Sequence, residues 1–161
     1  MLISETLNAA INTQIGEELG NSHQYIAIAA YFDSECLKLL AKIYYKQAEE
    51  ERTHAMKFVQ FLLDAGGKVT IPAIPVPRNT FSSPEDAARL AYDAEVGTTD
   101  KINSLMALAT AEKNYIAMNF LGWYVNEQLE EVSSASTRLT VIKRAGPNVL
   151  MIEAYLAHGG G

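Results

Sequence analysis

The sequence has one cysteine, few prolines and no long apolar run, and each shortage excludes a class of protein. A single cysteine among 161 residues can form neither an internal disulfide nor a cysteine-based zinc or iron–sulfur site. No apolar stretch reaches the roughly 18 residues that a transmembrane helix needs. The N-terminus lacks the basic start and apolar core of a signal peptide. We therefore expect a cytoplasmic protein that does not act at a membrane.

Positive charge is also scarce. Lys plus Arg number 13 against 19 for Asp plus Glu, which gives a formal net charge of −6. An acidic chain with no basic run argues against a nucleic-acid partner and is compatible with binding cations. Hydrophobic residues make up 48% of the chain and charged residues 20%. These are ordinary values for a globular protein, and the length predicts one domain over residues 1–161.

Proline, the strongest helix breaker, is confined to five positions, which are 72, 75, 77, 84 and 147. In the long proline-free segments, apolar residues recur at spacings of three and four, which is typical of helices that pack against one another. The pattern predicts four long helices and a short fifth one, over about 4–33, 36–65, 84–111, 112–144 and 147–158. We expect the glycine-rich end at 159–161 to be flexible.

Residues 66–82 form the one long connection between the predicted helices. In extended form they can span about 50 Å at roughly 3.1 Å per residue, enough to follow a helix of about 45 Å from end to end. The second and third helices can then run parallel, whereas short breaks make the other neighbours antiparallel. We therefore predict an all-α four-helix bundle with one long crossover and a short C-terminal helix.

The expected buried faces of the four long helices become polar near their midpoints. Each face carries one carboxylate there, and these are Glu18, Glu51, Glu95 and Glu131. His54 and Gln128 lie on the same faces, three residues from Glu51 and Glu131. Polar side chains that extend these stripes are Gln14, Asn21, Gln47 and Thr99. Because the midpoints of bundled helices share one layer, we expect the carboxylates to converge with His54 and Gln128.

Four carboxylates cannot be buried together as anions without compensation. Each carries an effective desolvation penalty of several kcal/mol, and their mutual repulsion adds to it. Protonation of the carboxylates would remove this cost, but bound cations compensate the charge better. Four carboxylates and one imidazole suit two divalent ions that share a bridging carboxylate, and oxygen-rich ligands favour iron or manganese. Tyr25, seven residues after Glu18 on the same face, is either a core tyrosine or a hydrogen-bonding or redox partner beside the metals.

Four segments together resemble the non-haem bacterial ferritins over essentially the whole chain. They are residues 18–25 (ELGNSHQY), residues 50–54 (EERTH), Glu95 and residues 123–131 (WYVNEQLEE). The resemblance implies a ferritin-like bundle that stores iron and oxidises it at a ferroxidase centre, with Tyr25 beside the centre. Bacterioferritins carry their haem-ligating methionine at the position of Arg52, so we expect no haem.

The resemblance also implies the iron ligands. Glu18, Glu51 and His54 correspond to the first iron site, with Glu51 as the bridge to the second. The second site corresponds to Glu95, Gln128 and Glu131. A third, nearby iron site is matched by Glu50, Glu127 and Glu130, although Glu127 and Glu130 are one turn apart and also fit a solvated acidic face.

The implied reaction and assembly are those of an iron store. Two Fe(II) ions are oxidised by dioxygen or peroxide, and the ferric product is stored as an oxyhydroxide mineral inside a hollow shell of twenty-four subunits. The short fifth helix either meets its copies at a four-fold axis or folds back on its own bundle. Two other functions fit the residues less well: a di-metal oxygenase or peroxidase on the same bundle, and a structural bundle without metal.

Overall fold

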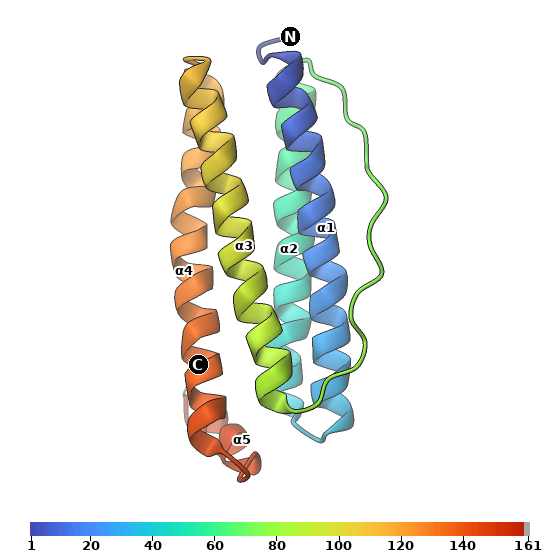
Figure 1. The fold of residues 1–161 in the computed structure, drawn as a ribbon, viewed down its shortest axis with the longest axis vertical. Helices are drawn as coiled ribbons and strands as arrows, with labels where there is room; N and C mark the ends of the chain where they lie inside the picture. Colours follow the sequence, from blue (N-terminus) through green and yellow to red (C-terminus); the bar gives the residue numbers. More distant parts are fainter. Residues whose placement is uncertain (160–161) are drawn as a thin grey trace.

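The computed structural model describes residues 1–159. This part of the chain contains five helices and no strand (Figure 1). They are α1 (Glu5–Ser34), α2 (Lys38–Asp64), α3 (Pro84–Ala111), α4 (Tyr115–Ala145) and α5 (Leu150–Ala157). The predicted all-α bundle with a short fifth helix is confirmed. Within these residues no helix is both long enough and apolar enough to cross a membrane. Residues 160 and 161 of the expected flexible end lie outside the described part.

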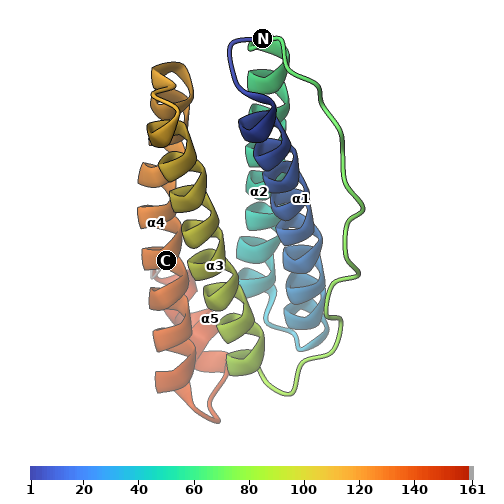
Figure 2. The same ribbon diagram turned by 45° about the horizontal axis from the view of Figure 1, so that its top comes forward.

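The long connection between α2 and α3 runs the length of the bundle (Figure 1). The helices α1 and α2 form one antiparallel pair, and α3 and α4 form the other, as both views show (Figures 1 and 2). Because the crossover returns the chain to the end where α2 begins, α2 and α3 are parallel, as the length of the connection predicted.

Side-chain caps define where three of the long helices begin. The hydroxyl of Ser4 accepts the Leu7 N–H at the start of α1, and the hydroxyl of Ser83 accepts the Asp86 N–H before Pro84. At α4 the cap is Asn114, which accepts the N–H of Ala117. The helix α4 therefore begins at Tyr115, three residues later than expected. The preceding Lys113 has φ 53°, a left-handed conformation that ends one helix before the next begins.

Two polar side chains of α1 hold the crossover along the helix. Asn12 donates its amide N–H to the Lys68 carbonyl (2.7 Å) and accepts the Thr70 N–H (2.7 Å). Gln24 makes the same kind of pair with Arg78, donating to its carbonyl (2.8 Å) and accepting its N–H (2.9 Å). Each side-chain amide makes the two backbone hydrogen bonds that a neighbouring strand would otherwise make. These N–H and C=O groups of the extended crossover are therefore paired without a sheet.

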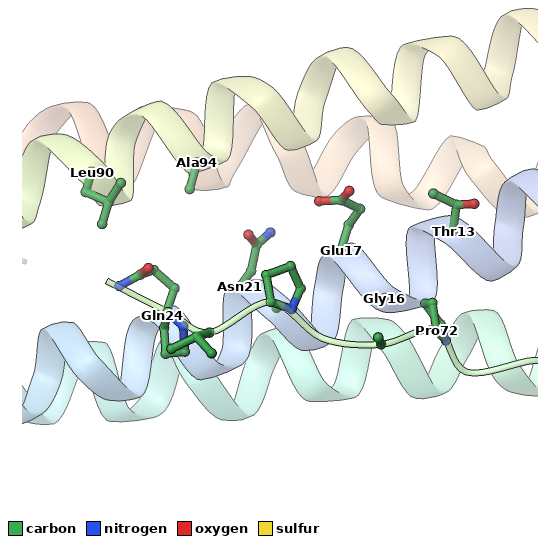
Figure 3. Close-up of a pocket in the computed structure, with 13 residues that line it drawn as sticks. Thr13, Gly16, Glu17, Asn21, Gln24, Pro72, Leu90 and Ala94 are labelled. Atoms are coloured by element: carbon green, nitrogen blue, oxygen red, sulfur yellow. The ribbon is translucent and has the colours of Figure 1, made fainter. Parts of the chain in front are cut away.

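The crossover packs tightly against α1 at Gly16, where a Cβ would overlap the ring of Pro72. Beside this contact, α1, α3 and the crossover enclose a cavity of about 420 Å³ (Figure 3). Its lining includes Glu17 and Asn21 from α1 and Leu90 from α3. None of the residues expected to bind iron lines this cavity.

The core consists of two apolar clusters, one toward each end of the bundle. One cluster includes Tyr25, Ile28, Phe32, Leu40, Tyr44 and Ile142. The other includes Leu7, Ile11, Phe58, Leu62, Ile102 and Leu121. Along each long helix, the residues between these clusters are the polar ones, so the bundle contains a polar layer between two apolar ones.

The helix α5 packs against its own chain, which is the fold-back arrangement. Ile152 is buried against Leu40 and its neighbours. The carboxylate of Glu153 accepts the backbone N–H groups of Leu39 (2.8 Å) and Leu40 (3.1 Å). It thereby caps α2, whose own N-cap residue provides no side-chain hydrogen bond. The opposite side of α5, with Leu150 among its residues, is exposed.

Candidate metal centre

The polar layer contains the six residues that the sequence singled out as ligands of the two iron positions. Each retains at most a few per cent of its surface, and they are Glu18, Glu51, His54, Glu95, Gln128 and Glu131. They come from all four long helices. On α3 the buried face runs through Ala91, Glu95 and Thr98, one residue away from the Tyr92 and Thr99 of the predicted face. On α1, Ser22 is buried where Asn21 was expected.

Glu18, Glu51 and His54 form the first group of potential ligands. Each offers one atom, and these atoms lie within 4.8 Å of one another. The Nδ1 atom of His54 is 3.6 Å from Glu51 Oε2 and 3.9 Å from Glu18 Oε2. An imidazole nitrogen that faces two carboxylate oxygens at these distances leaves room for a metal ion between them, because metal–ligand bonds are about 2 Å long.

Glu51, Glu95 and Glu131 form a second group that meets the same distance criterion. Glu51 belongs to both groups, which is the arrangement expected of a bridging carboxylate. Gln128 lies beside this second group. It donates to Glu95 Oε2 at 3.3 Å and to the hydroxyl of Thr99 at 3.1 Å. The structure therefore brings Gln128 to Glu95 and to the second group, as its spacing on α4 predicted.

The three glutamates expected at a third iron site line one surface cavity of about 320 Å³ between α2 and α4. These residues are Glu50, Glu127 and Glu130. They differ in how close they come to the buried centre. Glu127 forms a ligand group with His54 and Glu131, with 3.9 Å between His54 Nε2 and Glu127 Oε1. Glu130 is exposed, and Glu50 lies 3.6 Å from the ammonium group of Lys46.

Burial makes the negative charge of this centre costly in the metal-free chain. It raises the pKa of Glu18 well above the ordinary value, and the neighbouring charge of Glu51 adds to the effect. The pKa of Glu51 is raised by burial and then by Glu95, and burial also raises the pKa of Glu95. The pKa of Glu131 rises to about 7, through burial and the charge of Glu95. A divalent cation would relieve each of these costs.

One oxygen in the centre lacks any partner. Glu18 Oε2 is fully buried and accepts no hydrogen bond, whereas Glu18 Oε1 accepts the amide N–H of Gln14 at 2.8 Å. A buried carboxylate oxygen without a donor costs free energy. Because this oxygen faces His54 Nδ1, a cation bound between them would satisfy it. The donor set therefore fits a divalent metal ion.

Two glutamines support the centre and were missed as site residues. Gln14 donates to Glu18, and Gln47 donates to Glu131 Oε2 (2.7 Å) and Glu51 Oε1 (3.2 Å). Both were recognised as polar residues on buried faces but were not assigned a role. Each stands four residues before a metal-site glutamate, which places the two side chains on one helix face. That spacing is the signal that could have identified them.

Aromatic side chains enclose the centre. The hydroxyl of Tyr25 donates to Glu95 Oε1, which favours its interpretation as a hydrogen-bonding partner of a ligand. The hydroxyl of Tyr124 donates to the His54 carbonyl at 2.7 Å. The ring of Trp123 lies edge-on to His54 with 5.4 Å between centroids. These contacts fix the imidazole and one carboxylate before any metal binds.

The family model of the ferritin-like domain matches residues 8–145, most of the chain. The chain belongs to the ferritin family. Membership confirms the resemblance seen in the sequence, and it confirms iron storage with ferroxidase activity as the general function. The three ligand groups described above lie in the matched segment.

Curated relatives and solved structures agree with this membership. Ferritin BfrB of Mycobacterium tuberculosis is 43% identical over 150 residues, covering 93% of this chain and 83% of the relative. The bacterial non-heme ferritin of Staphylococcus epidermidis is 32% identical over 154 residues, covering 96% and 93%. An open pore ferritin from the archaeon Archaeoglobus fulgidus has a TM-score of 0.93 and 35% identity, covering 97% of each chain.

Proposed function

We propose that the polar layer is a ferroxidase centre that binds two Fe(II) ions as substrates. The observation that carries this proposal is the pair of buried ligand groups that share Glu51. Glu18, Glu51 and His54 would hold one ion. Glu51, Glu95 and Glu131 would hold the other, with Gln128 beside it. Two divalent ions would compensate the four carboxylates, and only oxygen and nitrogen atoms face them, which suits iron.

The reaction would be a two-electron oxidation shared by two iron ions. Each Fe(II) loses one electron, and dioxygen accepts both electrons and two protons to become hydrogen peroxide. With peroxide as the oxidant, two further electrons and two protons give two water molecules. The protein residues hold the two ions side by side, so that both electrons leave for one oxidant. Tyr25 orients Glu95 through its hydroxyl.

The cavity lined by Glu50, Glu127 and Glu130 would provide the third iron position. Support comes from Glu127, which contacts both His54 and the cavity. An ion held there would stand next to the buried pair, on the side between α2 and α4. The ligands in this cavity are partly hydrated, so we expect weaker binding than at the buried pair.

Storage requires a container, and we propose that twenty-four copies of the chain assemble into a hollow shell in which ferric oxyhydroxide accumulates. The structural neighbour from Archaeoglobus fulgidus, described as an open pore ferritin, supports self-assembly. The absence of haem and a cytoplasmic location remain predictions. Haem is tested by the visible spectrum of the purified protein, in which a Soret band would contradict the prediction.

The ferroxidase proposal is tested by loading the metal-free protein anaerobically with two Fe(II) ions per chain and then admitting air. We expect fast formation of the ferric absorption in the wild type. Replacing the shared ligand, Glu51→Ala, should slow it at least tenfold, because ligands to both ions are lost. The control is Glu49→Ala, an exposed glutamate on the same helix, which should oxidise iron like the wild type. Equal rates in wild type and Glu51→Ala would refute the assignment.

A further inference from the structure

Gln47 joins two carboxylates that come from different helices. The residue is 4% exposed. Its amide nitrogen donates to Glu131 Oε2 on α4 at 2.7 Å and to Glu51 Oε1 on α2 at 3.2 Å. Each of these carboxylates keeps its other oxygen free of Gln47, and Glu51 Oε2 lies 3.6 Å from His54 Nδ1. The amide therefore fixes one oxygen of each carboxylate, while Glu51 Oε2 faces His54.

The position of Gln47 relative to the two ligand groups is asymmetric. It contacts Glu51, which belongs to both groups, and Glu131, which belongs to the second of these two groups and also to the group with His54 and Glu127. The contact to Glu131 is the shorter one, so its loss should affect the second group most. Gln14 is the counterpart on the other side, because it donates to Glu18, a member of the first group alone.

Gln47 also lies where the buried centre meets the acidic cavity. It lines that cavity together with Glu50, Glu127, Glu130 and Glu131. Glu131 and the Gln47 amide are therefore neighbours in the wall of this cavity. Without this amide, the Glu131 side chain could turn toward the hydrated cavity, where a carboxylate is better solvated than in the core.

We propose that Gln47 is a positioning residue for the second metal position, and that its amide keeps Glu131 turned inward toward Glu51 and Glu95. The inference rests on the proposed two-ion centre. A residue that orients a metal ligand changes metal affinity by roughly 10- to 100-fold when it is removed. The change should fall on one of the two ions, whereas a general loss of packing would weaken both.

The experiment titrates Co(II) anaerobically into the metal-free assembled protein and follows the two tightest binding steps by calorimetry and by the visible Co(II) spectrum. The test variant is Gln47→Met, which keeps the length of the side chain and removes the amide. We expect it to weaken one step at least tenfold and to leave the other unchanged. The matched variant Gln14→Met should weaken the step that Gln47→Met spares.

The results separate the two proposals. A wild type that binds fewer than two Co(II) ions per chain would overturn the ferroxidase centre and the role of Gln47 with it. A wild type that binds two ions, together with a Gln47→Met variant that binds both as tightly or weakens both equally, would overturn the role of Gln47 alone. If Gln47→Met does not fold, Gln47→Asn replaces it, because the shorter amide keeps its polarity and cannot reach Glu131. The same selective loss is then expected.

Discussion

The buried glutamates of the candidate metal centre lie between two apolar clusters, so a proton or a bound cation stabilises each of them. In the metal-free chain burial raises the pKa values of Glu18, Glu51, Glu95 and Glu131, so each of these carboxyl groups keeps a proton more readily than an exposed glutamate does. Ligands must release their protons when a metal ion binds. Metal uptake is therefore coupled to proton release, and affinity should fall as the pH is lowered.

The pKa of Glu131 predicts how the stability of the metal-free protein depends on pH. The folded-state pKa is about 7 against an ordinary value of 4.5, so between these pH values the folded chain keeps a proton that the unfolded chain releases. The stabilisation from this proton is complete below pH 4.5 and is lost as the pH rises to 7. The total loss is about 3 kcal/mol.

The measurement compares metal-free wild type with Glu131→Gln in denaturant titrations at several pH values. The neutral variant should gain stability over the wild type between pH 4.5 and 7, and the difference should then level off. The control is Glu130→Gln, an exposed neighbour on the same helix, which should show no such trend. A difference between wild type and Glu131→Gln that does not vary with pH would contradict the prediction.

Residue spacing was enough to predict which side chains gather in the buried polar layer but not the contacts that support them. Glu18, Glu51 and Glu131 could be predicted because a charge on an apolar face at spacings of three and four stands out against its neighbours. The roles of Gln14 and Gln47 could not, because a glutamine on such a face bonds whichever carboxylate its rotamer reaches. For Gln47 that carboxylate lies on another helix, Glu131 of α4.

The spacing of apolar residues predicted that each helix exists, but it predicted the buried face and the ends of a helix less well. The helix α3 is rich in alanine, so Ala91 and Tyr92 both fit an apolar face, and only packing shows that Ala91 is the buried one. The start of α4 depends on the left-handed Lys113 and on the Asn114 cap. Nothing in the apolar pattern reveals a backbone angle, so the break was placed three residues early.

The close fit between α1 and the crossover leads to a prediction for Gly16. A methyl group at this position would overlap Pro72, so Gly16→Ala should push the crossover away from α1 and cost about 1–3 kcal/mol. Trypsin should then cleave faster at the crossover residues Lys68 and Arg78, and the thermal midpoint should fall. Both can be measured on the intact protein.

The control for this variant is Gly97→Ala, which also lies within a helix but has no atom within 4 Å of the added methyl group. Alanine favours a helix over glycine by up to about 1 kcal/mol, so Gly97→Ala should keep or raise the thermal midpoint. If both variants behaved alike, the contact with Pro72 would not be the cause.

For the whole molecule, the size of the particle decides between storage and the other functions considered. Twenty-four chains of 17.6 kDa would form a closed symmetric particle of about 420 kDa. We expect gel filtration with light scattering to give a mass in this range and the particle to retain iron after loading. A small dimer that retains no iron would instead favour a di-metal oxygenase or peroxidase on the same bundle.

The cap that Glu153 provides for α2 has a consequence for biosynthesis. The amides of Leu39 and Leu40 donate to an acceptor on α5, so this end of α2 stays frayed until α5 has left the ribosome. The first helical hairpin is then completed only by residues that are made after α3 and α4. A chain that terminates before α5 would lack the Glu153 cap. Its α2 would then expose an uncapped N-terminal turn to the proteases that remove incomplete chains.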